Sequence, residues 1–465
     1  MKSGQHDPTL LLDLCSRILD LVGGRAEAEV TVSSGRSALT RFANSFIHQN
    51  VAETGQWARV RVVVDGRIAS AGTSLLATGL DAMVERALDA ARFRPVDPDW
   101  PGLAPPLPAP PTPEGAYDPD THVAAPEARA QVVRDFVAPG GGDAHGAALA
   151  DALADALADG LTAAGYCQTG GHEVAFANSA GQQLWGHTTR AVIEGIHRSA
   201  EGDGGGQQVA ARIADLDGAA AGRRAAGKAR RSVDMIDADP GDWEVVLEPN
   251  SVVDVLDLLT GHGFNAKHHA EGRSFVRLGE QQMDESLTIF DDALDPRIIG
   301  MPFDAEGTPR GRLDLVKAGV STALCHDRRT AREAGTGSTG HAVAGGEAAG
   351  PIPHHVFLQP GDRSPEDIVA GVERGLLITD FWYTRILDPK TTVVTGLTRN
   401  GTFLIENGQI TRAVRNLRFT QSYIEALAPG NVVAVGTDGR LAGESQFFAP
   451  TLHLKSWHFS GGAKG

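Results

Sequence analysis

A repeated four-residue segment constrains the fold of this chain most strongly. Phe42-Ala43-Asn44-Ser45 recurs as Phe176-Ala177-Asn178-Ser179, at a similar distance from the predicted helices on either side. The order of predicted elements around the two copies also agrees. We therefore interpret residues 1–240 as a duplicated helix–antiparallel sheet–helix domain. Two unrelated αβ units that happen to share this order are the alternative.

The first copy is predicted to begin and end with a helix. Leucines recur at helical spacing between Thr9 and Leu21, and Gly23-Gly24 ends that helix. A second helix is predicted from Thr78 to Arg92. Between them, alternating segments predict short strands separated by turns at Ser34-Gly35 and Asp65-Gly66. The predicted strands are Ala28–Val32, Ala38–Phe42, Phe46–Val51, Trp57–Val64 and Arg67–Ala71.

A proline-rich stretch separates the two copies. Prolines crowd residues 95–126 and predict an extended connector, because proline removes backbone donors. After it we expect a helix from Ala147 to Ala164, strands between Glu173 and Ile196, and a helix from Ala210 to Arg231. The predicted units are an αβ module at 1–94, the connector at 95–126, a second αβ module at 127–240 and a C-terminal domain at 241–465.

The C-terminal domain is predicted to be rich in strands. A strand at Glu244–Leu247 leads through Pro249 into an amphipathic helix at Ser251–Leu259. Short strands with Gly, Asp and Asn turns follow from Ser286 onward. The strands are Leu287–Phe290, His355–Leu358, Thr392–Thr395, Thr402–Ile405 and Val432–Val435, with turns at Asn400-Gly401, Asn407-Gly408 and Asp438-Gly439. The fold class is therefore α+β with two domains.

Charge and cysteine usage exclude some functions. Of the 465 residues, 42 are Lys or Arg and 58 are Asp or Glu, a net charge of −16 that disfavours direct binding to nucleic acid. Three cysteines without CxxC spacing suit a reducing compartment. The N-terminus has charges among its leucines, unlike a signal peptide, and no apolar run approaches the roughly 20 residues of a membrane span. We expect a cytoplasmic protein that spans no membrane.

Familiar catalytic motifs are missing from the sequence. It contains no HExxH or HExxxH, in which two helical histidines bind zinc, and no GxSxG nucleophile turn. A metal site assembled across loops is a further possibility, because histidines and one cysteine gather in the C-terminal domain. These residues are His262, His268, His269, Cys325, His326, His341, His354 and His355. The alternative is that they are surface or hydrogen-bonded histidines.

Several ordered segments resemble the TldD/PmbA family. The opening strands of that family are similar to Arg41-Phe42-Ala43-Asn44-Ser45 followed by His48-Gln49-Asn50. Landmarks of its C-terminal half resemble residues 270–275 (AEGRSF), 302–307 (PFDAEG), 338–342 (STGHA), 380–385 (DFWYTR), 395–401 (TGLTRNG) and 404–408 (LIENG). The set spans nearly the whole chain, and its order makes it specific.

The resemblance implies a division of labour between two kinds of subunit. TldD-type members carry HExxxH on a helix soon after the domain boundary, bind zinc there and cleave peptides inside a closed chamber. TldE/PmbA-type members lack the motif and assemble with a TldD-type partner. The helix at the corresponding place here, Ser251–Leu259, has neither His nor Glu. The resemblance therefore implies no catalytic residue, metal ligand or cofactor in this chain, with zinc expected in the partner.

Three short segments are predicted to contact substrate. A β-rich domain can hold an unfolded peptide by main-chain hydrogen bonds at a sheet edge, and an arginine can pair with a peptide carboxylate. The predicted substrate-binding residues are Glu271, Arg273, Thr339, His341, Tyr383 and Arg385. The alternative is that these residues only hold the fold together.

The leading functional hypothesis is a TldE/PmbA-like subunit of a heteromeric zinc-dependent peptidase. Its partner would be a TldD-type HExxxH subunit, and its substrate a peptide or unfolded polypeptide that is degraded or matured. One alternative is a homodimeric peptide-binding protein without catalysis. Another is a self-sufficient hydrolase that uses the histidines and Cys325 as a metal site. The family carries the historical label of a modulator of DNA gyrase. Since the net charge of this chain is −16, we expect any effect on DNA to be indirect.

Overall fold

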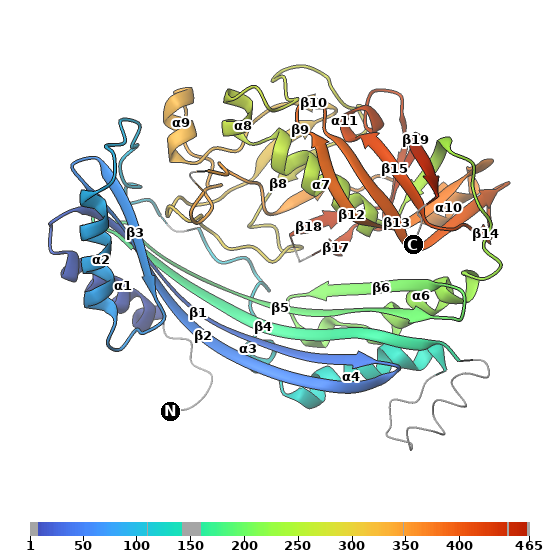
Figure 1. The fold of residues 1–465 in the computed structure, drawn as a ribbon, viewed down its shortest axis with the longest axis horizontal. Helices are drawn as coiled ribbons and strands as arrows, with labels where there is room; N and C mark the ends of the chain where they lie inside the picture. Colours follow the sequence, from blue (N-terminus) through green and yellow to red (C-terminus); the bar gives the residue numbers. More distant parts are fainter. Residues whose placement is uncertain (1–7, 109, 142–159, 347, 444–445, 463–465) are drawn as a thin grey trace.

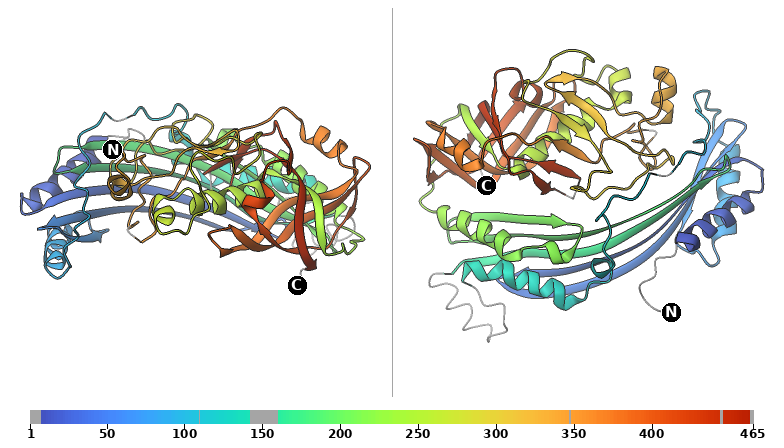
Figure 2. Two further views of the ribbon diagram at one scale, coloured as in Figure 1. Left: turned by 90° about the horizontal axis from the view of Figure 1, so that it is seen from above. Right: turned by 180° about the vertical axis from the view of Figure 1, so that it is seen from behind.

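The computed structural model describes residues 8–108, 110–141, 160–346, 348–443 and 446–462. It is 23% helix and 40% strand. A long, strongly curved sheet forms the N-terminal half, and a β-rich C-terminal half lies over the concave face of that sheet (Figure 1). The view from behind shows the helices of the N-terminal half on the opposite, convex face (Figure 2). This arrangement confirms the α+β fold class.

The N-terminal half contains one six-stranded antiparallel sheet and its helices. The strands are β1 (Glu27–Ala43), β2 (Phe46–Val64), β3 (Arg67–Thr73), β4 (Thr162–Asn178), β5 (Gln183–Arg198) and β6 (Asp203–Ala210). The helices are α1 (Pro8–Val22), α2 (Leu80–Arg92), α3 (Pro119–His122), α4 (Pro126–Val137) and α6 (Gly218–Arg231), with 3₁₀ turns η1 (Ala138–Gly140) and η2 (Ile213–Asp215).

The order of the strands fits a duplication. The sheet runs β3-β2-β1-β4-β5-β6, so two three-stranded meanders meet where β1 pairs antiparallel with β4. Helices α1 and α2 pack on one end of the sheet and α4 and α6 on the other, each pair over its own apolar cluster. Each copy of the repeated segment runs into the turn after the first strand of its meander, with Asn44 and Ser45 at positive φ in the first copy. The residue boundaries of the domains stay a prediction.

One predicted turn and two pairs of predicted short strands are in fact parts of continuous strands. The turn predicted at Ser34-Gly35 is wrong, because β1 passes straight through it and Gly35 pairs with Gly55 of β2. Glycine supplies the same backbone donor and acceptor as any other residue, so the ladder continues without side chains at that point. The result is two strands of 17 and 19 residues that cross the whole sheet.

Two helix predictions of the second copy need correction. Most of the helix predicted at Ala147–Ala164 falls on residues 142–159, outside the described residues, but its end is wrong because β4 starts at Thr162. The helix predicted from Ala210 starts at Gly218 instead. The carboxylate of Asp217 accepts a hydrogen bond from the Ala220 N–H at 2.7 Å and so caps that helix.

The C-terminal half contains two further sheets. One runs β10-β9-β8-β11-β18-β17 and the other β12-β7-β19-β15-β13-β14, with β16 paired to β19. The strands are β7 (Gly241–Leu247), β8 (Ile289–Asp291), β9 (Leu313–Lys317), β10 (Val320–Ser321), β11 (Val356–Leu358), β12 (Arg374–Asp388), β13 (Val393–Glu406), β14 (Gln409–Ala413), β15 (Leu417–Ser422), β16 (Val432–Val435), β17 (Arg440–Ala442), β18 (Phe447–Ala449) and β19 (Leu452–Gly462). The helices are α7 (Pro249–Gly263), α8 (Ala266–Ala270), α9 (Arg328–Ala334), α10 (Pro365–Ala370) and α11 (Tyr423–Ala426).

Helix α7 packs in the main core of this half. Its apolar side chains, such as Val252 and Leu256, share one buried cluster with residues of both sheets.

Of two turns predicted in the C-terminal half, one is confirmed and the other is wrong. Asn407-Gly408 forms the β13–β14 turn with positive φ at both residues, as expected for a two-residue hairpin. The turn predicted at Asn400-Gly401 is wrong, because that pair lies inside β13 at an irregularity in its pairing with β12.

The two halves are joined by polar contacts along the curved sheet. Arg61 of β2 lies 3.4 Å from Glu306, and the Gln182 side chain donates to the Gly307 carbonyl at 3.0 Å. Arg329 of α9 forms an ion pair with Asp97. Of the helices that the structure describes, none is long and apolar enough to cross a membrane.

Candidate functional site

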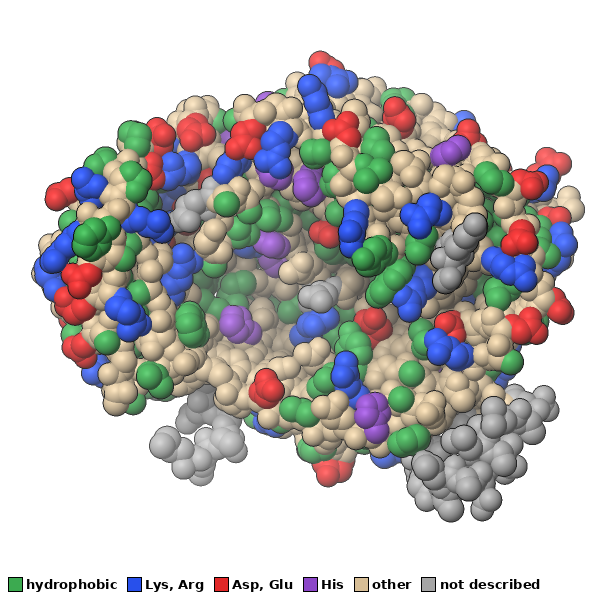
Figure 3. Space-filling view, in the orientation of Figure 1, with side chains coloured by type: hydrophobic (Ala, Val, Ile, Leu, Met, Phe, Trp, Pro, Cys, Tyr) green, Lys and Arg blue, Asp and Glu red, His purple; other side chains and the backbone are tan. Residues whose placement is uncertain are grey.

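A groove separates the middle of the curved sheet from the C-terminal half. Its volume is about 620 Å³. The space-filling view shows a hollow on this face of the molecule (Figure 3). Strands β1, β2, β4 and β5 provide the floor, while Ile299, His355 and Gln446 of the C-terminal half line the opposite side. The groove is therefore built at the junction of the two halves.

The floor of the groove is open at Gly55. The backbone register places Gly55, Gly35, His172 and Thr188 in one row across four strands. A β-carbon added at Gly55 would meet no atom within 4 Å, so this position borders open space. In the absence of a side chain at Gly55, a ligand can approach the sheet closely.

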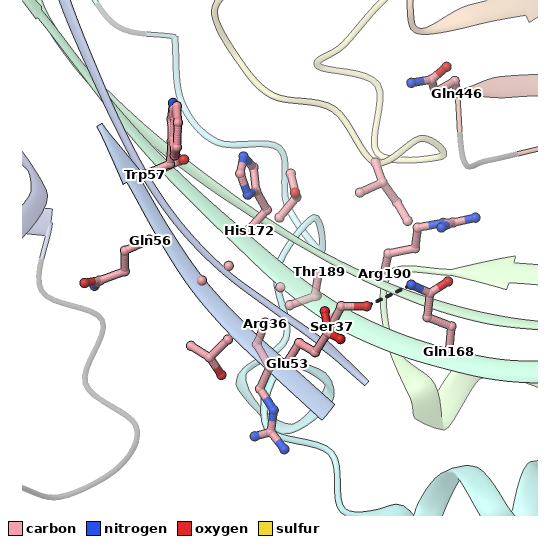
Figure 4. Close-up of a pocket in the computed structure, with 18 of the residues that line it drawn as sticks. Arg36, Ser37, Glu53, Gln56, Trp57, Gln168, His172, Thr189, Arg190 and Gln446 are labelled. Carbon is pink, nitrogen blue, oxygen red and sulfur yellow. Dashed lines mark hydrogen bonds between the residues drawn. The ribbon is translucent and has the colours of Figure 1, made fainter. Parts of the chain in front are cut away.

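Larger polar and aromatic side chains surround this floor (Figure 4). Trp57 and His172 stand on the concave face in the close-up, and Arg190 points toward Gln446. The Gln168 amide donates a hydrogen bond to Ser37 at 2.9 Å. Nε of Arg190 is buried and has no hydrogen-bond partner among the described residues. The groove thus holds an arginine whose hydrogen-bonding capacity is only partly used.

The roof carries a histidine with a defined tautomer. Nδ1 of His355 lies 2.8 Å from the guanidinium of Arg310. Since arginine only donates, Nδ1 is the acceptor, and the proton of the neutral ring is on Nε2. Burial and the nearby Arg310 lower the pKa of His355 to about 3, so the ring is neutral at physiological pH. His355 therefore presents an N–H donor at the groove.

A buried ion pair supports this roof. Oδ2 of Asp291 accepts the backbone N–H groups of His354 at 2.8 Å and His355 at 2.7 Å. Oδ1 lies 3.2 Å from Nε2 of the fully buried His341. Burial favours the neutral forms of both side chains, but the carboxylate of Asp291 raises the pKa of His341 to about 10. Burial also raises the pKa of Cys325, so its thiol stays protonated and Asp291 supplies the counter-charge.

The same cluster does not form a hydrolase site. A cysteine, a histidine and an aspartate in contact match the residue types of a nucleophilic triad. However, Cys325 and His341 are each 0% exposed, and burial raises the pKa of the thiol instead of activating it. No substrate reaches the sulfur in this structure. The cluster is a structural support of the groove.

Helix α7 holds a carboxylate whose two oxygens are both engaged. Asp254 accepts hydrogen bonds from Thr384 at 2.6 Å and from Tyr423 at 2.8 Å. Burial raises the pKa of Asp254 to about 6, against the effect of these two donors. The residues of α7 do not fit a zinc site of the HExxxH type, which needs two histidines and a glutamate.

The histidines of the C-terminal half contact one another and nearby side chains and backbone groups. The rings of His262 and His268 stack at 5.5 Å between centroids, and His268 contacts the His262 carbonyl at 3.3 Å. His326 accepts bonds from Thr339 at its backbone. Among the described residues, no group of three or more His, Cys, Asp or Glu is arranged to hold a metal ion. Nδ1 of His262 and Nδ1 of His326 are buried without a hydrogen-bond partner among the described residues, and the interpretation of these histidines stays a prediction.

The six residues predicted to contact substrate form three separate pairs. Glu271 and Arg273 make an exposed ion pair at 2.9 Å after α8. Thr339 Oγ1 lies 2.8 Å from Nδ1 of His341, beneath the groove roof. The Arg385 guanidinium lies 4.3 Å from the ring centroid of Tyr383 on β12. The contacts within each pair are structural, and their contact with substrate stays a prediction.

Sequence analysis missed the groove itself. Its floor includes Gly35, which the sequence predicted to lie in a turn, together with Gly55 and Gly170-Gly171. The usable signal was that glycine precedes both copies of the repeated segment at a similar distance, at Gly35 in the first and at Gly170-Gly171 in the second. The register sets Gly35 opposite Gly55 on the neighbouring strand. His355 was singled out as a metal candidate but lines the groove roof instead.

Burial of a further carboxylate makes the stability depend on pH. Burial raises the pKa of Asp380 on β12 to about 7, although Asn400 donates to it at 3.1 Å. Because the folded pKa exceeds the unfolded value of about 3.9, this group costs stability progressively as pH rises from about 4 to 7. We expect Asp380→Asn to increase the free energy of unfolding by about 2 kcal/mol at pH 8 and little at pH 4.5, as measured by urea denaturation. If the free energy of unfolding of the variant depended on pH in the same way as that of the unchanged chain, Asp380 would ionise without a cost to stability.

The fold and the domain models define a metallopeptidase-related class of protein. A model described as the PmbA/TldA metallopeptidase C-terminal domain matches residues 240–461, and one described as PmbA/TldA metallopeptidase domain 1 matches residues 28–91. These two matches cover the β-rich C-terminal half and the first meander. The chain belongs to the TldD/PmbA family.

Individual relatives are distant in sequence. A metalloprotease from Methanothermobacter thermautotrophicus is 27% identical over 286 residues, which are 57% of this chain and 60% of that protein. A metalloprotease TldD homolog from Haemophilus influenzae is 26% identical over 208 residues, 44% of this chain and 43% of that protein. The alignments thus span about half the length of these curated relatives.

Solved structures share the fold over almost the whole chain. TldE from Thermococcus kodakarensis has a TM-score of 0.82 at 18% identity and covers 97% of this chain and 99% of its own. A protein from Thermotoga maritima described as a modulator of DNA gyrase has a TM-score of 0.78 at 18% identity, covering 96% and 99%. At this identity the likeness establishes the fold alone.

Proposed function

We propose that this chain is a TldE/PmbA-type, non-metal subunit of a heteromeric zinc-dependent peptidase. A TldD-type partner with an HExxxH helix would bind the zinc and cleave peptides or unfolded polypeptides. The observation that carries the proposal is α7. It follows β7 at the start of the C-terminal half, where the resemblance to the family implies the metal-binding helix of TldD-type members. It contains no His or Glu between Ser251 and Leu259, and its Asp254 carboxylate is bonded to two hydroxyl groups.

An exposed aromatic surface on β12 offers a place for the partner. Trp382 is 51% exposed, Tyr383 64% and Leu387 60%, although large apolar side chains are usually buried. Arg399 lies 4.0 Å from the Trp382 ring centroid. Trp, Tyr and Arg are the residues most enriched at the energetic centres of protein interfaces. We assign this aromatic patch, defined as Trp382, Tyr383 and Leu387, to the contact with the TldD-type subunit.

The conformation of Tyr383 supports the same assignment. Its φ is +58°, a region that costs free energy for a residue with a β-carbon, and it lies at an irregularity in the β12–β13 pairing. The ring is 64% exposed, and the Arg385 guanidinium lies 4.3 Å from its centroid. A chamber closed by two subunits would lie beside the interface between those subunits. The substrate contacts predicted for Tyr383 and Arg385, and those predicted for the other two pairs, therefore remain part of the proposal.

A complementation assay tests this proposal. The purified chain is mixed with a TldD-type HExxxH subunit encoded in the same genome, and hydrolysis of an unfolded polypeptide is followed. We expect activity only from the mixture, and none when the HExxxH glutamate of the partner is replaced by Gln. Equal activity of the partner with and without this chain would refute the proposed role.

A further inference from the structure

The groove places opposite charges at the two ends of one cross-strand row. Glu53 of β2 pairs with Ser37, Ser37 pairs with Gly170 of β4, and Gly170 pairs with Arg190 of β5. All four residues line the groove. The acid and the base are therefore separated by two residues whose side chains are small or missing.

The spacing of this row suits a short extended peptide. Three strand spacings separate β2 from β5, which places the outer Cα atoms about 14 Å apart. The long side chains of Glu53 and Arg190 reduce the distance between their charges. An extended chain spans at most about 3.3–3.6 Å per residue, so about three or four residues reach from one charge to the other.

The basic end of the row can bind a carboxylate. Nε of Arg190 is buried without a hydrogen-bond partner among the described residues, which is costly unless a ligand fills it. A guanidinium binds a carboxylate through two parallel N–H···O bonds. His355, whose proton is on Nε2, and the amide of Gln446 line the same groove and add neutral donors. These side chains offer hydrogen-bond donors, which suit an anionic ligand better than a cationic one.

The acidic end of the row can attract an amine. The side chain of Glu53 is exposed and forms no ion pair or hydrogen bond with another described residue. The α-amino group of a peptide has a pKa of about 8 and is mostly charged at pH 7. Because Glu53 is exposed, its attraction for an ammonium is weakened by water and salt, so this end should contribute less than the half-buried Arg190.

We propose that the groove is a binding site for short unblocked peptides of about three or four residues, with the terminal carboxylate on Arg190 and the terminal amine toward Glu53. The proposal rests on the peptidase function and extends it by naming a ligand class for this subunit. A complex that cleaves polypeptides releases such zwitterionic fragments. The open floor at Gly55 leaves room for the backbone of such a peptide whatever its side chains.

Calorimetry with tetra-alanine tests the two ends separately. The full chain is titrated with the free peptide, its C-terminal amide and its N-acetyl form. We expect amidation to weaken binding by about tenfold, since a charge-assisted bidentate contact is lost, and acetylation by about threefold, since Glu53 is exposed. The same affinity for all three forms, or no binding of the free peptide, would overturn the proposal.

Charge-neutral variants assign each end to its residue. Arg190→Gln should bind the free peptide about tenfold more weakly and no longer discriminate against the amide. Glu53→Gln should no longer discriminate against the acetyl form. Arg41→Gln and Glu27→Gln remove the same charges from exposed positions of β1 outside the groove and should keep both preferences. Discrimination that survives in Arg190→Gln would contradict the assignment.

A steric variant provides a test that does not depend on charge. Gly55→Leu adds a side chain to open space above the floor, where no atom lies within 4 Å of the new β-carbon, so folding should be preserved. We expect it to abolish binding of the free peptide, and unchanged affinity would place the ligand elsewhere. These titrations need no partner subunit. A chain that binds peptides with end selectivity but fails to complement the HExxxH subunit would refute only the proposed function.

Discussion

Asp291→Ala is expected to lower the free energy of unfolding by about 3–5 kcal/mol, the range for breaking a buried ion pair on one side. The substitution leaves the His341 imidazolium buried without its counter-charge. It also leaves the backbone N–H groups of His354 and His355 without an acceptor. Urea denaturation with a two-state fit to the C-terminal transition measures the loss.

A matched control separates the buried pair from a surface pair. Asp314 of β9, in the same sheet as Asp291, forms an exposed pair with Arg312 at 2.9 Å. Asp314→Ala should change the free energy of unfolding by less than about 1 kcal/mol, because exposed ion pairs contribute little. Asp291→Asn, which keeps an oxygen for the two N–H groups, should fall between the two. Equal effects of both alanine variants would show that the cluster does not support the fold.

Trp382→Glu is expected to weaken assembly with the TldD-type subunit by on the order of 100-fold or more, because it replaces an exposed aromatic ring at the proposed interface centre with a charged side chain. Trp382 is 51% exposed in the isolated chain, so the stability of this chain should hardly change. Analytical ultracentrifugation of the mixed subunits measures the dissociation constant, and thermal melting checks the fold.

Phe93 provides the control for that substitution. It is 88% exposed at the end of α2, away from β12. Phe93→Glu introduces the same charge at an exposed aromatic position and should leave assembly unchanged. If Trp382→Glu assembled as tightly as Phe93→Glu, the aromatic patch would not be the partner surface.

The helices and the fold class could be predicted from sequence because they depend on local periodicity. The helix at Thr9–Leu21 and that at Ser251–Leu259 were located to within a few residues, since apolar side chains recur at helical spacing in both. The extent of β1 and β2 could not be predicted. Glycine is equally compatible with a turn and with an extended strand, and only pairing of Gly35 with Gly55 decides between them.

The candidate site was only partly accessible from sequence for a related reason. The absence of ligands in α7 is a local property and could be read directly from Ser251–Leu259. The groove is not local, because Glu53 and Arg190 are brought into one row only by the register of four strands. The role of His341 was likewise hidden, since its partner Asp291 lies 50 residues earlier in the chain and outside the segments that resemble the family.

Native mass spectrometry of the complex formed with the HExxxH subunit tests the central claim most directly. Mass and metal content are read from the same ion, so the stoichiometry and the location of zinc are measured together. We predict a heteromer that contains this chain, with zinc equal in number to the HExxxH subunits, and no bound zinc on this chain alone. Stoichiometric zinc on the isolated chain, or failure to form the heteromer, would contradict the assignment of this protein as the non-metal subunit.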